Sequence, residues 1–144
     1  MKVLGHPIHM MLIHFPSALF PMEFVCYCIY YFTGQVSFAQ AAFYAMAGGV
    51  GLGWVAVLFG AIDLIKIPAD KTEVMKKALL HGSINTTVVI IYTVFFYSLY
   101  KKYPMLPPAS IGLTVTKAGV IGAMIIGNFM GGRLVLKDRI GAEK

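Results

Sequence analysis

Charged side chains are scarce in this chain and are missing altogether from long stretches of it. Only 12% of the 144 residues are charged, whereas 58% are hydrophobic. A soluble domain carries about a quarter charged residues. The widest charge-free gaps lie between Lys2 and Glu23, between Glu23 and Asp63, and between Lys77 and Lys101. Each gap provides the roughly 20 apolar residues that a spanning helix needs, so residues 1–144 are interpreted as one integral membrane domain.

Motifs of soluble enzymes and of covalent cofactor attachment are also missing. The two cysteines, Cys26 and Cys28, point different ways on a helix and cannot form a normal disulfide. The sequence has no C-x-x-C-H haem attachment motif and no zinc-type C-x-x-C pair. It also lacks a Walker loop, a Rossmann fingerprint, a G-x-S-x-G elbow and a basic run with interleaved aromatics. We therefore expect neither an enzyme nor a nucleic-acid-binding protein.

Four apolar segments predict four spanning helices. We place these helices at about residues 9–32, 43–65, 78–100 and 110–133, the third continuing a helix that begins near Thr72. The first segment is too long for a signal peptide and has no convincing cleavage site, so we expect it to be retained. Pro16 and Pro21 lie inside it and predict a kink. Short connections favour antiparallel neighbours and predict an all-α, up-down-up-down four-helix bundle.

Lysine and arginine are distributed unevenly between the two ends of this bundle. Nine fall on the end that holds both termini: Lys2, Lys66, Lys71, Lys76, Lys77, Arg133, Lys137, Arg139 and Lys144. Three fall on or towards the other end: Lys101, Lys102 and Lys117. The positive-inside rule therefore predicts that both termini are cytoplasmic. The net charge of +6 is interpreted as a sign of topology and of contact with lipid headgroups.

Polar side chains from all four spans are predicted to meet in one layer near the cytoplasmic end. His14 lies about 10 Å into the first span, at 1.5 Å per residue, and His81 lies near the start of the third. Ionisable side chains inside a membrane usually face the bundle interior, so we expect these groups to converge. The complete layer comprises His6, His9, His14, Asp63, His81, Asn128 and Arg133.

The histidines allow two interpretations. His14 and His81 come from different helices at matching depth, which suits a bound cofactor or metal. A purely structural hydrogen-bonded pair is the alternative, and His6 by itself can simply reach the interface. Asn85 lies one turn after His81 on the same helix. It can orient His81 or form a hydrogen bond across helices.

Two further charges lie deep in the outer half of the bundle. Glu23 lies roughly 14 Å beyond His14, and Lys117 roughly 24 Å from Arg133, at the helical rise per residue. Both therefore fall at similar heights. We predict an ion pair, because an unpaired buried charge is costly. The alternative is a protonated Glu23 with Lys117 extending outward.

Small residues recur at helical spacing in the second and fourth spans. The second span has Gly49, Gly53 and Gly60, and the fourth has Gly119, Gly127 and Gly131. Such stripes usually indicate close helix packing. A flat cofactor can use the same smooth surface, which leaves a second interpretation.

The opening of the chain resembles the DUF2231 family of bacterial four-span membrane proteins. The segment GHPIHMMLIHFP at residues 5–16 is similar to the family's opening signature, although Met10 stands where the family commonly has proline. Shorter similarities are GAID at 60–63, ALLH at 78–81 and GGRLV at 131–135. Members are similar to domains fused or adjacent to Rieske and c-type cytochrome modules. The resemblance implies a bacterial inner-membrane protein in a redox setting.

Three functions fit these features. The first is a b-type haem protein in electron transfer, with haem b held by His14 and His81 and with His9 as the substitute for His14. Asn85 would orient His81, and Arg133 would pair with haem propionates.

The second function is that of an accessory subunit of a larger respiratory or photosynthetic membrane complex. In that case the histidines either ligate a chlorophyll-type tetrapyrrole or form hydrogen bonds only within the protein. The third is a carrier of protons or transition-metal ions. It would use His9, His14, Asp63, His81 and Glu23. Other membrane or redox subunits are expected partners, and the oligomeric state is left open.

Overall fold

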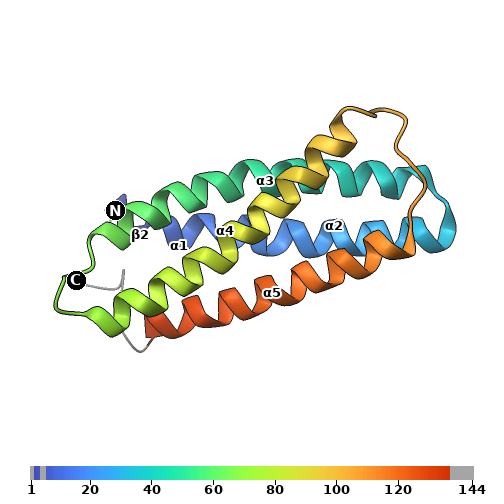
Figure 1. Cartoon of the computed structure of the whole chain (residues 1–144). Helices are drawn as coiled ribbons and strands as arrows, with labels where there is room; N and C mark the ends of the chain where they lie inside the picture. The colour runs from blue at the N-terminus through green and yellow to red at the C-terminus, as the bar shows by residue number, and fades with distance from the viewer. Residues whose placement is uncertain (1, 4–5, 137–144) are drawn as a thin grey trace.

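The chain folds into long helices that lie side by side (Figure 1). The computed structural model describes residues 2–3 and 6–136, with their side chains from residue 8 onward. Its helices are α1 (Ile8–Leu12), α2 (His14–Thr33), α3 (Val36–Ile65), α4 (Thr72–Tyr100) and α5 (Ile111–Leu136). Two-residue strands β1 (Lys2–Val3) and β2 (His6–Pro7) pair antiparallel before α1. The predicted all-α class is confirmed for this described part of the chain.

Four helical segments in the described residues are long and apolar enough to cross a membrane. They are Ile8–Thr33, which joins α1 and α2, then Val36–Ile65, Thr72–Tyr100 and Ile111–Leu136. Large apolar side chains cover their outer surfaces, and Phe32 and Ile65 are more than 80% exposed. A soluble domain would bury such side chains. The predicted four-span membrane architecture is therefore confirmed.

The first span is interrupted at Ile13. Pro16 has no N–H to donate to the carbonyl of Leu12, and its ring clashes with that carbonyl in a regular helix. The neighbouring bonds persist, since Ile13 N–H donates to His9 O at 3.1 Å and Ser17 N–H donates to Ile13 O at 3.2 Å. The interruption falls about one turn before Pro16, in the region where the prolines predicted a kink, whereas Pro21 is accommodated inside α2.

The second span begins earlier than predicted. Gly34 ends α2 in the left-handed conformation, with φ 69°, and α3 starts at Val36 rather than near residue 43. The polar side chains of Ser37 and Gln40 in this stretch are exposed, while Ala39 is buried against the bundle. The helix can therefore include these polar residues, because they lie on its outer face. The helix that carries the third span does begin at Thr72, as predicted.

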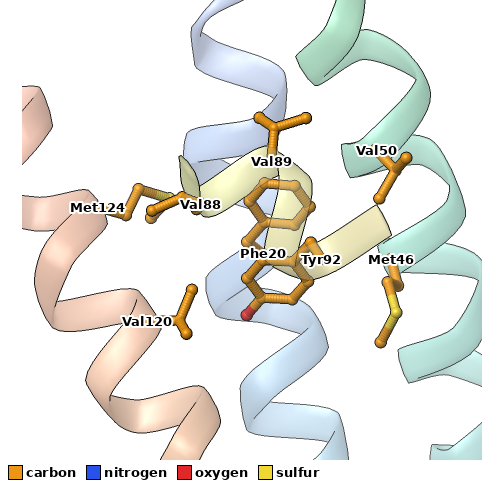
Figure 2. Packing of buried hydrophobic residues seen from close by; sticks show 8 residues of the cluster. All are labelled: Phe20, Met46, Val50, Val88, Val89, Tyr92, Val120 and Met124. Carbon is orange, nitrogen blue, oxygen red and sulfur yellow. The ribbon is translucent and has the colours of Figure 1, made fainter. Parts of the chain in front are cut away.

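The helices close a ring in which each packs on two neighbours. α2 contacts α3 and α5, and α4 contacts the same two helices. Successive helices run in opposite directions (Figure 1). A buried apolar cluster fills the middle and draws on α2, α3, α4 and α5 (Figure 2). The Phe20 and Tyr92 rings stack at its centre, with centroids 3.9 Å apart and planes 5° apart.

Close packing of α2 on α3 depends on a glycine. A Cβ on Gly49 would lie 2.5 Å from Cε1 of Phe20, so the ring occupies the space of a side chain. This contact supports the packing interpretation of the α3 stripe. Gly119 of the α5 stripe differs, because nothing in the described residues lies within 4 Å of its hypothetical Cβ.

Candidate functional site

His9 is anchored on α3 near one end of the bundle. Its Nδ1 lies 2.9 Å from the carbonyl oxygen of Ala56. The imidazole rests against Gly60, one turn further along α3, where a Cβ would lie only 2.8 Å from Cε1 of His9. A glycine at residue 60 therefore makes room for this ring.

His81 is anchored on α5 in the same way. Its Nδ1 lies 2.7 Å from the carbonyl oxygen of Gly127. The ring rests against Gly131, where a Cβ would lie 2.5 Å from Cε1 of His81. Both histidines therefore use a backbone carbonyl and a glycine one turn later on the antiparallel neighbouring helix.

The two anchors belong to a wider likeness between the halves of the chain. The histidine and its carbonyl are 47 residues apart for His9 and 46 for His81. Phe20 follows His9 at the same interval at which Tyr92 follows His81, and these two rings stack on each other. The first two spans thus relate to the last two by an approximate two-fold arrangement, with the Phe20–Tyr92 stack near its axis.

The hydrogen bonds fix the protonation of both rings. A carbonyl oxygen only accepts, so Nδ1 of each histidine carries the hydrogen. The Asn85 amide nitrogen, 3.2 Å from Nδ1 of His81, therefore has its true acceptor in the His81 carbonyl oxygen at 3.1 Å. Within the described chain, Nε2 of neither histidine has a hydrogen-bond partner. Metal-binding histidines commonly have this arrangement, with the second nitrogen held by a carbonyl.

His9 lies close enough to both His81 and Asp63 for an electrostatic interaction with each of them. Asp63 is half-buried, and its carboxylate lies 3.4 Å from the ammonium of Lys66. This part of the predicted polar layer is present. No group of three histidine, cysteine or acidic side chains in the described residues is arranged to hold a metal ion.

Within the described part of the chain, the remaining members of the predicted layer form no hydrogen bond with the two anchored imidazoles, and they take different positions around this end of the bundle. The expectation that His14 faces the interior is wrong, because its side chain is exposed on the outside of the bundle. Arg133 is also exposed, at the end of α5. Asn128 donates to the Ser17 hydroxyl at 3.0 Å and ties α5 to α2. The His6 side chain lies outside the described residues.

The predicted pairing of Glu23 with Lys117 is confirmed. The Lys117 ammonium donates to Oε1 of Glu23, and both side chains are completely buried. The ammonium also lies 3.9 Å from the centroid of the Tyr27 ring, a favourable cation–π contact. In the described chain, Oε2 of Glu23 and the Tyr92 hydroxyl make no hydrogen bond to other groups, and the two lie near enough to interact with each other.

Tyrosine side chains form hydrogen bonds between segments at the end of the bundle opposite His9 and His81. Tyr27 accepts a hydrogen bond from the Ser110 N–H at 3.0 Å, and Tyr30 donates to the Pro107 carbonyl at 3.4 Å. The Tyr44 and Tyr103 hydroxyls lie 2.5 Å apart, and this hydrogen bond raises the pKa of Tyr103. Tyrosine side chains are typical of a membrane–water interface, where the ring meets lipid and the hydroxyl meets polar groups.

Sequence reasoning missed the role of the carbonyls and glycines that hold the imidazoles. The available signal was the recurrence of histidine followed, at nearly constant separation, by a glycine in the next span. Gly60 and Gly131 were instead assigned to packing stripes or to a flat cofactor. The structure shows that each faces an imidazole, and Gly127 faces the Asn85 amide.

Comparisons with known proteins agree with the architecture. No curated protein and no solved structure matches the chain. A family model described as "Predicted membrane protein (DUF2231)" matches residues 5–144. That match includes all four spans and both anchored histidines. The chain therefore belongs to the DUF2231 family of predicted membrane proteins.

Proposed function

We propose that this membrane protein binds one haem b between His9 and His81 and serves in electron transfer. The observation that carries the proposal is the matched pair of anchored imidazoles. Each has Nδ1 committed to a backbone carbonyl at 2.9 or 2.7 Å and leaves Nε2 without a partner in the described chain. An unprotonated Nε2 is the atom that ligates iron.

The number of protein ligands favours haem over a free metal ion. The described residues offer no cluster of three metal-ligating side chains, and transition metals held by protein alone usually have at least three protein ligands. A porphyrin supplies four nitrogens itself and needs only two axial ligands. One imidazole from each half of an approximate two-fold arrangement provides that number.

His9 replaces His14 as the first ligand in this proposal. His14 is exposed on the outside of the bundle, whereas His9 is half-buried and lies within electrostatic range of His81. With two axial imidazoles the iron has no open position for a substrate, which suits electron transfer. Arg133 and the lysines near this end are candidates to neutralise propionates.

The apolar middle of the bundle disfavours a proton or metal carrier. The stacked rings of Phe20 and Tyr92 and the surrounding aliphatic side chains form an apolar cluster in the middle of the bundle (Figure 2). Phe20 lies between His9 and Glu23 along the first span. A polar path through this cluster is not visible in the described residues. Electrons, unlike protons, need no such path.

An absorption spectrum of the protein, purified after expression with ample haem, tests the proposal. We expect the bands of six-coordinate haem b, and their loss in His9→Ala and in His81→Ala. His14→Ala is the matched control and should retain the spectrum. A colourless wild-type protein would refute haem binding. Loss in His14→Ala with retention in His9→Ala would instead identify His14 as the ligand.

A further inference from the structure

A groove on the outer side of the bundle lies between α4 and α5. Its volume is ≈ 480 Å³, within the range of about 300–1,000 Å³ that is usual for ligand sites. On the α4 side it is lined by Ile84, Val88 and Ile91, and on the α5 side by Gly119 and Ala123. Both helices are candidate membrane spans, so the groove opens towards the lipid.

The hydroxyls that line this groove are bonded within their own helices. Thr87 donates to the Ser83 carbonyl oxygen at 2.8 Å, and Thr116 donates to the Gly112 carbonyl oxygen at 2.9 Å. A hydroxyl has only one hydrogen to donate, so neither is left to donate to a ligand. The groove therefore suits a hydrocarbon occupant better than a polar one.

Basic side chains lie at the end of the groove that is nearer to the histidines. Lys77 precedes Ile84 by seven residues, about two helical turns, and therefore lies on nearly the same side of α4. His81 contacts Gly131 on the antiparallel helix α5, so Lys77 and Arg133 lie at a similar depth in the membrane. Both side chains are exposed.

The distance from Lys77 to the groove matches the reach of a lipid tail. Ile84 and Ile91 lie roughly 10 and 21 Å along α4 from Lys77, at 1.5 Å per residue. One leaflet supplies about half of a hydrocarbon core that is about 30 Å thick. A phospholipid whose phosphate meets Lys77 can therefore place one tail in the groove.

We propose that this groove binds one anionic phospholipid, with an acyl tail between α4 and α5 and its phosphate beside Lys77 and Arg133. Basic pockets between spanning helices typically bind anionic headgroups. Cationic side chains also outnumber acidic ones among the described residues at this end, with Lys66, Lys71, Lys76, Lys77 and Arg133 against Asp63, Asp70 and Glu73.

A second copy of the chain is a poorer occupant of the groove. A two-fold axis along the membrane normal would bring Lys77 and Arg133 of both copies together at the same depth, and like charges across an interface are unfavourable. An anionic headgroup instead neutralises them. Lipid binding does not require haem, so it can be tested separately from the proposed function.

Native mass spectrometry of the purified, delipidated full-length protein counts the bound lipids. We expect one phosphatidylglycerol to bind about tenfold tighter than phosphatidylcholine with the same tails, because only the headgroup charge differs. Gly119→Leu places a side chain in the groove, where nothing in the described chain lies within 4 Å of the Cβ, and should weaken phosphatidylglycerol binding about tenfold. Lys77→Gln with Arg133→Gln should reduce that binding to the level of phosphatidylcholine.

Two matched controls should bind phosphatidylglycerol as wild type does. Gly51→Leu adds the same side chain on the open face of α3. Lys101→Gln with Lys102→Gln removes two positive charges at the opposite end of the bundle.

Three results would overturn the proposal. Equal affinity of wild type for the two lipids would mean that the headgroup is not recognised. Full binding by either test variant, or equal losses in test and control variants, would mean that lipids adsorb to the surface without using this site. A wild-type dimer that Gly119→Leu dissociates would assign the groove to a second copy. Loss in both test variants, with retention in both controls, supports the assignment.

Discussion

At the scale of single residues, His9 and His14 show that the depth of a residue in the membrane does not tell which way its side chain faces. Both histidines lie near the same end of the first span, and His14 was favoured because it lies deeper. Five residues turn a helix by about 140°, so two side chains at this spacing face different directions. The chain is also interrupted between them, at Ile13. Only the packing of α1 on α3 identifies His9 as the inward-facing ring.

Gly131→Ala should disturb His81 directly. The added Cβ would lie 2.5 Å from Cε1 and 2.9 Å from Nδ1 of the imidazole, so the ring must move and its bond to the Gly127 carbonyl is lost. We expect the free energy of unfolding to fall by about 1–3 kcal/mol, as for overpacking elsewhere. Unfolding by SDS in mixed micelles measures this change.

Gly132→Ala is the matched control for that experiment. It adds the same methyl group to the next residue of α5, where nothing in the described chain lies within 4 Å. Its stability should equal or slightly exceed that of wild type, because alanine is the better helix former. Equal effects of the two substitutions would contradict the close contact between Gly131 and His81.

The Glu23–Lys117 pair should show strong energetic coupling. Replacing either partner alone, with Glu23→Gln or Lys117→Met, leaves an unpaired group in a fully buried place, and about 3–5 kcal/mol of stability should be lost. The double variant has no buried charge and should lose much less than the sum of the single losses. A double-mutant cycle of unfolding free energies measures the coupling, and additive losses would argue against a buried ion pair.

At the scale of elements, hydropathy predicted the spans well and their first residues less well. Long apolar runs located all four helices, and the prolines predicted the interruption in the first. The start of α3 could not be predicted, because Ser37 and Gln40 resemble loop residues until the neighbouring helix shows which face is buried. The depth match of Glu23 and Lys117 was predictable because helical rise is constant. The carbonyl anchors were not, because backbone acceptors leave no signal in side-chain chemistry.

Gly49→Ala tests the packing of α2 on α3. Its Cβ would lie 2.5 Å from Cε1 and 2.7 Å from Cδ1 of Phe20, and this ring is held in place by its stack with Tyr92. We expect a loss of about 1–3 kcal/mol in the free energy of unfolding. Gly51→Ala, on the open face of the same helix, should leave stability unchanged. If Gly49→Ala left the free energy of unfolding unchanged, α2 and α3 would be able to move apart with little loss of stability.

At the scale of the whole molecule, the two ends of the bundle are chemically different. One end holds two imidazoles with unused nitrogens, and the other holds a neutral ion pair. The apolar cluster around Phe20 and Tyr92 fills the middle of the bundle (Figure 2). Which membrane face each end meets then depends on the orientation of the chain.

The distribution of lysine and arginine predicts that the histidine end is cytoplasmic and the opposite end faces outward. Two exposed positions, Asp70 between α3 and α4 and Lys102 after α4, report on the two ends. In a background with Cys26→Ala and Cys28→Ala, a membrane-impermeant maleimide should label Lys102→Cys on intact cells. Asp70→Cys should react with the maleimide only after the membrane is permeabilised. Labelling in the reverse order would place the histidines on the outer side and the Glu23–Lys117 pair nearer the cytoplasmic side, without changing the internal geometry of either end.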